Sequence, residues 1–153
     1  MTRKCRKVIF FTLFVTALLC ITVSLSLLQR SNEKLHLRQT EIDNAFLSAY
    51  SSTIDHIFYT TDHLSIAQIT EHQQNICETA YFAQQTLHLS SFSQNDSLLQ
   101  LTQALHQLAR NNENLAPLGE DNYLLLVKAV AEPHSEDGAT AALKMLQKHY
   151  PFL

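Results

Sequence analysis

The chain has 153 residues, of which 46% are hydrophobic, and carries a formal charge of −3 at pH 7. This length allows one small domain plus an extension, and excludes two full domains. From residue 29 onward seven basic residues stand against all 14 acidic ones, a net charge of −7, and residues 39–109 contain no Lys or Arg. Such a segment lacks the clustered cations that nucleic acids and anionic membrane surfaces require, so both are excluded as partners.

The N-terminal segment predicts a transmembrane helix. Residues 8–28 contain no charge, Gly or Pro, and as a helix they would extend about 31 Å, enough for a bilayer core. Arg3, Lys4, Arg6 and Lys7 precede them, and Lys and Arg stay on the cytoplasmic side. We therefore expect a cytosolic tail over residues 1–7, a signal anchor over 8–28 and an exported domain, periplasmic or extracellular, over 29–153.

Two alternatives compete with a retained anchor. A cleaved signal peptide has a passable small-x-small site at Ser24-Leu25-Ser26, and a lipoprotein has Cys20 at the end of an apolar run. A signal-peptide core usually runs only about 7–15 apolar residues, and this one is longer. Cys20 follows Leu19, a large residue where lipid attachment favours a small one. The retained anchor is the favoured interpretation.

The cysteines predict no disulfide framework. The anchored topology places Cys5 in the cytosol, Cys20 in the membrane and Cys77 alone outside. A lone exported cysteine is either buried or paired with another chain. We expect Cys77 to be buried, since free cysteine behaves as a small apolar residue.

The remainder reads as all-α, a short antiparallel bundle of about five helices. Both glycines and all three prolines fall in the last third, and no strand alternation is sustained. The expected helices are 32–60, which can continue the membrane helix, then 66–89, 97–111, 120–132 and 136–149. Ser65 and Gln68 form a capping box for the second. The apolar spacing predicts inward positions that include Leu35, Ile66 and Ile76.

The helix expected over 120–132 is apolar on most sides, so it is either bundle core or part of a docking face. We take the hairpin of residues 120–150 as the best docking surface for a protein partner or a second copy. The alternative is that this hairpin is simply the core. The predicted partner-binding residues are Tyr123, Leu124, Leu126, Val127, Val130, Leu143 and Leu146.

This hairpin resembles a single tetratricopeptide repeat. Tyr123 and Leu126 in one helix, with Ala139, Leu143 and Pro151 after them, have that family's spacing. Val127 and Val130 depart from the pattern, where the family has a small residue and an aromatic one. The resemblance implies a helical hairpin used for protein binding.

The membrane segment resembles the start of the pseudopilins of secretion machines. Phe11-Thr12-Leu13 and Ala17-Leu18 carry the resemblance, which implies a secretion component. Phe10 stands where that family has the glycine of its peptidase site, and Val15 where it has an acidic residue.

Three acid–histidine pairs, Asp55-His56, Asp62-His63 and Glu71-His72, suggest a possible site. No pair has the spacing of zinc ligands one helical turn apart. A chain reversal at 60–65 would bring His56 or Tyr59 near the other two histidines and create a composite site at a helix–helix elbow. Three interpretations remain: ordinary helix surface, a metal site formed by His56, His63 and His72, or a pH sensor.

Catalysis and cofactors have no sequence support. There is no Gly-rich phosphate loop and no GxSxG elbow. The carboxylate pairs Glu120-Asp121 and Glu136-Asp137 sit at helix starts, where the helix dipole favours them. Asn95-Asp96-Ser97 reads either as a glycosylation sequon or as a helix cap.

We therefore expect a non-enzymatic, single-pass membrane protein that acts as a binding or assembly subunit of a secretion or envelope complex. The first alternative is an extracytoplasmic metal, pH or ligand sensor that uses the elbow between His56 and His72. A pseudopilin-like component and a cleaved secreted protein are the further alternatives.

Overall fold

The computed structural model describes the backbone of residues 3–113 and 115–153, and the side chains from residue 14 onward within these ranges. The predicted cytosolic tail and residues 8–13 of the predicted span lie outside the described side chains. Within the described ranges the chain has five α-helices, one short 3₁₀ helix and no strand, which confirms the all-α prediction. The chain falls into two units, Met1–Arg38 and Gln39–Leu153.

Helix α1 (Arg3–Ile57) belongs to both units, so the predicted continuity between the membrane segment and the first bundle helix is confirmed. In the described part of the chain it is the one helix long and apolar enough to cross a membrane. Its apolar window has no buried side chain. A secretory signal sequence near an N-terminus meets the same criteria of length and composition.

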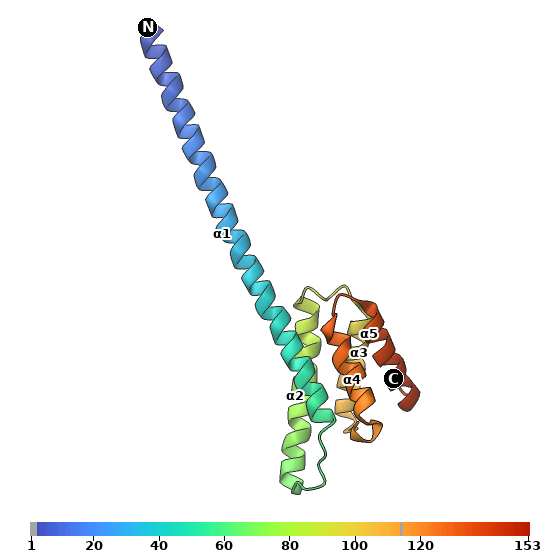
Figure 1. Ribbon diagram of the computed structural model, residues 1–153. Coiled ribbons are helices and arrows are strands. Elements are labelled where there is room, and N and C mark those ends of the chain that lie inside the picture. The colour runs from blue at the N-terminus through green and yellow to red at the C-terminus, as the bar shows by residue number, and fades with distance from the viewer. Residues whose placement is uncertain (1–2, 114) are drawn as a thin grey trace. The chain divides into compact units, whose positions relative to one another are not determined.

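The second unit is an antiparallel bundle (Figure 1). The end of α1 is followed by α2 (Ile66–Leu89), α3 (Asp96–Arg110), the 3₁₀ helix η1 (Ala116–Leu118), α4 (Glu120–Ala131) and α5 (Glu136–His149). At each end of the bundle a hydrogen bond joins residues that are far apart in the sequence. Gln39 at one end donates to the carbonyl of Leu89, and the amide of Leu115 at the other end donates to that of Ile57.

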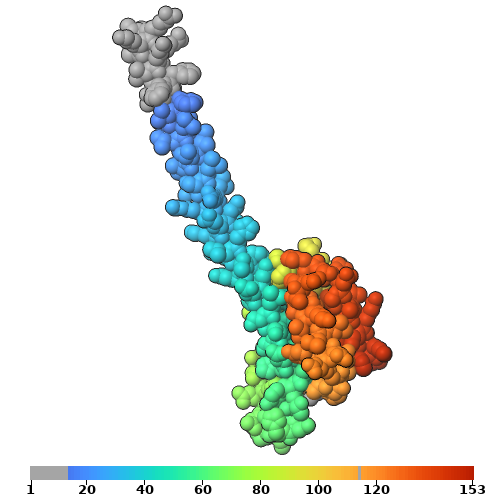
Figure 2. Space-filling view, in the orientation of Figure 1, coloured from blue at the N-terminus to red at the C-terminus, as the bar shows by residue number. Residues whose placement is uncertain are grey.

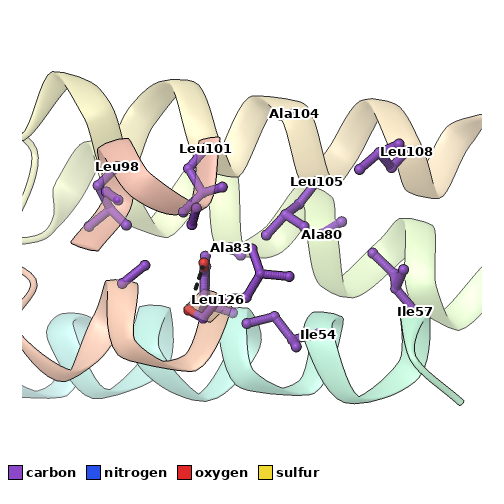
Figure 3. Close-up of a cluster of buried hydrophobic side chains, with 14 of the residues drawn as sticks. Ile54, Ile57, Ala80, Ala83, Leu98, Leu101, Ala104, Leu105, Leu108 and Leu126 are labelled. Atoms are coloured by element: carbon purple, nitrogen blue, oxygen red, sulfur yellow. Dashed lines mark hydrogen bonds between the residues drawn. The ribbon is translucent and has the colours of Figure 1, made fainter. Parts of the chain in front are cut away.

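The core is a continuous set of apolar side chains from α1, α2, α3, α4 and α5 (Figure 3). Tyr50 lies at its centre, fully buried, and its hydroxyl donates to the carbonyl of Leu126 at 3.2 Å. Burial raises the pKa of this phenol, because the anion would lose its hydration. Tyr50 thus joins α1 to α4 by both packing and a buried hydrogen bond.

Two of the predicted inward positions are wrong. Leu35 is 61% exposed and Ile66 is 85% exposed, whereas Ile76 is buried as expected. Leu35 lies in the first unit, and Ile66 is the first residue of α2. Both have the right helical spacing, but neither is covered by a neighbouring helix.

Helices α4 and α5, orange and red in Figure 2, are neighbours in the bundle, and they approach each other closely at small residues. Ala129 on α4 and Ala139 and Ala142 on α5 are all buried. A Cβ atom added to Gly138 would lie 3.2 Å from the Cα of Ala129 and 3.2 Å from the carbonyl oxygen of Lys128. Glycine at this position therefore sets how tightly the hairpin closes.

Side-chain caps fix where two helices begin. Ser65 caps α2 through the predicted capping box with Gln68. Asn95 caps α3 by accepting from the amide of Leu98 at 2.9 Å, and its Nδ2 donates to the carbonyls of Pro133 and Ser135, both at 3.0 Å. Asn95 is buried and its amide is fully engaged, which favours the cap over the sequon.

Asp43 fastens α1 to the loop that follows α2. Its carboxylate accepts from the amide and the hydroxyl of Ser91, at 2.8 and 2.7 Å, and from Gln39 at 3.0 Å. Partial burial would raise the pKa of Asp43, but these hydrogen bonds, with help from His134, outweigh it and lower the pKa.

We expect Asn95→Ala to lower the free energy of unfolding by about 2 kcal/mol, because the cap and a buried contact to Pro133 are both lost. Asn95→Asp keeps the acceptor for Leu98 but faces two carbonyl oxygens with a carboxylate at pH 7. It should be as unstable as the alanine variant at pH 7 and recover partly in acid. Denaturant unfolding of the solubilised chain measures both, with exposed Gln94→Ala as control. Wild-type stability for Asn95→Asp at pH 7 would contradict this role.

The lowered pKa of Asp43 predicts stability that is present above the ordinary carboxyl pKa and lost as pH falls through the folded-state value. Asp43→Asn should therefore cost about 1 kcal/mol at pH 7, after allowance for solvent screening, and almost nothing near pH 3. Unfolding curves at both pH values measure this. Glu41→Gln, an exposed carboxylate on the same helix, is the matched control and should change little. An equal loss at both pH values would contradict the prediction.

Candidate functional site

The acid–histidine stretch forms an aromatic cluster where α1 ends and α2 begins. We call His56, Tyr59, His63 and His72 the elbow cluster. The ring centres of His56 and His72 are 5.2 Å apart, and the Tyr59 ring lies 5.3 Å from His72 and 5.6 Å from His63. The predicted chain reversal at 60–65 therefore does bring these rings together. Edge-on contacts of this kind are favourable for aromatic pairs.

Hydrogen bonds to the end of α1 hold the cluster in place. The last carbonyls of a helix have no partner within it. Here Nε2 of His72 lies 3.1 Å from the carbonyl oxygen of His56, and because a carbonyl only accepts, this nitrogen must carry the proton. The amide of Leu115 donates to the carbonyl of Ile57 at 3.1 Å. The hydroxyl of Tyr59 pairs with Nε2 of His63 at 3.0 Å.

Two cavities flank the cluster and share His56, Tyr59 and His72 in their walls. The smaller, about 60 Å³, reaches inward to Ile76 and Ala109, and Glu113 lies at its edge. It is too small for an organic ligand. The larger, about 300 Å³, is open to solvent and faces the first turns of α2. We call this second cavity the elbow groove.

The cluster is not arranged as a metal centre. Among the described residues no group of three or more His, Cys, Asp or Glu side chains could hold a metal ion. His56, His63 and His72 were the metal candidates. Nε2 of His72 donates to a backbone carbonyl, and Nε2 of His63 is hydrogen-bonded to the hydroxyl of Tyr59. The interpretation as ordinary helix surface is incomplete too, because His56 and His72 are half-buried while His63 is exposed.

The predicted docking surface on the α4–α5 hairpin needs a correction. Leu126, Leu143 and Leu146 are buried in the core, so they are not available to a partner. Leu124 is 44% exposed. Tyr123, Val127 and Val130 are half-buried, and the hydroxyl of Tyr123 donates to Asp55 at 2.8 Å. The apolar pattern identified the hairpin, but it did not distinguish the side that faces α1 and α3 from the side that faces solvent.

Cys77 is half-buried at the edge of the core, and its thiol donates to the carbonyl of Ala109 at 3.4 Å. The prediction of a buried cysteine is therefore met only in part. On the neighbouring helix, burial together with the nearby Arg110 lowers the pKa of His106. Nδ1 of His106 lies 2.8 Å from Oε1 of Gln84 and must donate to it. No local sequence motif predicts the contact between Gln84 and His106, because these two residues are 22 positions apart in the sequence.

The bond between His72 and the end of α1 predicts one imidazole tautomer. Near pH 7.5 we expect nitrogen NMR spectra of the solubilised chain to show His72 with its proton on Nε2, because the carbonyl of His56 accepts that proton. His88, exposed near the end of α2, serves as the control and should exchange between tautomers. If His72 caps α1 in this way, His72→Gln should lower the free energy of unfolding by about 1 kcal/mol. A proton on Nδ1 of His72, together with unchanged stability of the glutamine variant, would contradict the cap.

Comparison of the chain with protein-family models, with curated proteins and with solved structures gave no match.

Proposed function

We propose that this chain is a single-pass membrane protein whose bundle binds a protein partner, as a subunit of a membrane-associated secretion or envelope complex. The observation that carries the proposal is the continuity of α1. The same helix contains the apolar, unburied stretch suited to a membrane and the side chains at the centre of the bundle core. A helix shared in this way would hold the bundle at the membrane, where a partner would meet it.

The charge distribution supports one orientation. Four basic residues precede the apolar segment, and the remainder of the chain carries seven basic residues against 14 acidic ones. Basic flanks stay in the cytoplasm, so the bundle would lie outside. An acidic bundle in that position would select partners with basic surfaces and would avoid the anionic lipid headgroups next to it.

The outer side of α4 supports a contact surface. Leu124 exposes 44% of its surface, next to half-buried Tyr123 and Val127. Exposed apolar groups ringed by polar residues mark interaction sites more often than single leucines do, and here the neighbours extend the apolar area. A protein partner or a second copy of the chain would cover this area.

The elbow cluster favours a second candidate function, an extracytoplasmic pH or ligand sensor. Three imidazoles lie close together with Tyr59 at the junction of two helices, and imidazole is the side-chain type best suited to sensing pH near neutrality. Protonation would place like charges close together at the point where α2 is joined to α1. For this candidate, replacing both His63 and His72 by Gln should abolish any acid-induced change in association.

Gentle solubilisation of native membranes, followed by capture through a C-terminal tag, tests the first proposal. We expect a protein partner at fixed stoichiometry, and Leu124→Gln should reduce its recovery about tenfold, the effect of losing roughly 1.4 kcal/mol of contact. Ile66→Gln, the same change at an exposed position on α2, is the matched control and should leave recovery unchanged. A chain that comes out alone, or only as a homodimer, would refute the role in a larger complex.

A further inference from the structure

The elbow groove combines aromatic and polar side chains. Its rings are those of His56, Tyr59 and His72, and its polar groups include Glu71 and Asn75 on α2. The groove has a volume of about 300 Å³ and is shallow and open to solvent, so a side chain presented by a partner can reach it directly.

Two polar side chains of the groove have no partner within the described part of the chain. Gln68 is engaged, because its Oε1 accepts from Ser65 in the capping box. The side chains of Glu71 and Asn75, by contrast, make no hydrogen bond or ion pair with any residue that the structure describes. Tyr59 is 45% exposed, and its hydroxyl is already paired with His63, so its ring rather than its hydroxyl is left to meet a ligand.

An unpaired carboxylate beside aromatic rings binds a cation. The ring of Tyr59 attracts a cation placed over it within about 6 Å, and Glu71 would complete a charge-assisted hydrogen bond. A planar guanidinium can stack on the rings and bind a carboxylate with two N–H groups, which an ammonium cannot do. The chain has no Lys or Arg in residues 39–109 that could fill the groove from α1 or α2.

We propose that the elbow groove binds a basic side chain, arginine in preference to lysine, presented by the protein partner. This rests on the proposed role as a binding subunit and names the chemistry of the partner. The charge of −7 over residues 29–153 would draw a basic segment toward the bundle, and Glu71 with Tyr59 would fix one of its side chains.

Titration of the full chain in nanodiscs of zwitterionic lipid tests the proposal. The probe is an acetylated and amidated Gly-Ser peptide with one arginine, and the same peptide with citrulline is its uncharged isostere. We expect the arginine peptide to shift the NMR signals of the Tyr59 and His72 rings, with an affinity at least about fivefold above that of the citrulline peptide.

Glu71→Gln should weaken the arginine peptide about fivefold, and Tyr59→Leu should do the same without unfolding the chain, since Tyr59 lies outside the core. The control is Glu78→Gln, which removes an equal charge two turns along α2, where Glu78 pairs with Gln74. Equal losses for Glu71→Gln and Glu78→Gln would mean diffuse attraction to an acidic surface, and equal binding of citrulline would mean that charge plays no part. Either result overturns the proposal.

The co-purified partner separates this inference from the proposed function. If Glu71→Gln leaves the partner's recovery unchanged while Leu124→Gln reduces it, the assembly role stands and the groove proposal falls. If the arginine peptide binds as expected but no partner co-purifies, the groove proposal stands and the assembly role falls.

Discussion

The burial of one stripe of α1 is the constraint on which the bundle depends. Phe46, Tyr50, Ile54 and Ile57 are each at most 1% exposed, and complete burial of such side chains contributes about 1.5–3 kcal/mol apiece. Between them Ser48, Ser51 and Asp55 are exposed, so the helix has one buried apolar side in the bundle. Over residues 14–28 the same helix is apolar around its whole circumference. The patterning of this one helix therefore changes along its length, from uncharged on every side to apolar on one side.

The end of α1 connects this core to the elbow groove. The carbonyl of His56 accepts from His72 on α2 and from the amide of Tyr59, and the carbonyl of Ile57 accepts from the amide of Leu115 in the segment after α3. The side chain that caps the helix is also a wall of the groove. A substitution that displaced His72 would therefore alter both the end of α1 and the lining of the groove.

Local sequence signals identified the helices well, because caps and breakers act over a few residues. The capping box at Ser65 placed the start of α2 correctly, and the predicted bounds of α2 and α5 agree with the structure. The expected first helix, 32–60, is in fact continuous from Arg3 and ends at Ile57. Its end depends on the later contacts with His72 and Leu115, which local spacing does not contain.

Which apolar side chains would be buried was harder to predict. Helical periodicity shows which residues share one side of a helix, but not whether another helix covers that side. Leu35 and Ile66 have core spacing and lie exposed, whereas Leu126, predicted as a docking residue, is fully buried. Tyr50 did not stand out as the central core residue, because a tyrosine suits either surface or interior until its hydroxyl finds a partner. The elbow could be anticipated as a meeting of rings, but not the bond from His72 to a carbonyl that removes one candidate metal ligand.

The buried phenol of Tyr50 gives this protein an internal reporter of its own integrity. The chain has five tyrosines and no tryptophan, so phenol absorbance and emission are not masked by indole. Because burial raises the pKa of Tyr50, its ionisation is linked to the opening of the core around it. Tyr59 and Tyr81 are exposed and lie outside this core. In an alkaline titration the last phenolate to form therefore marks the separation of α1 from α4.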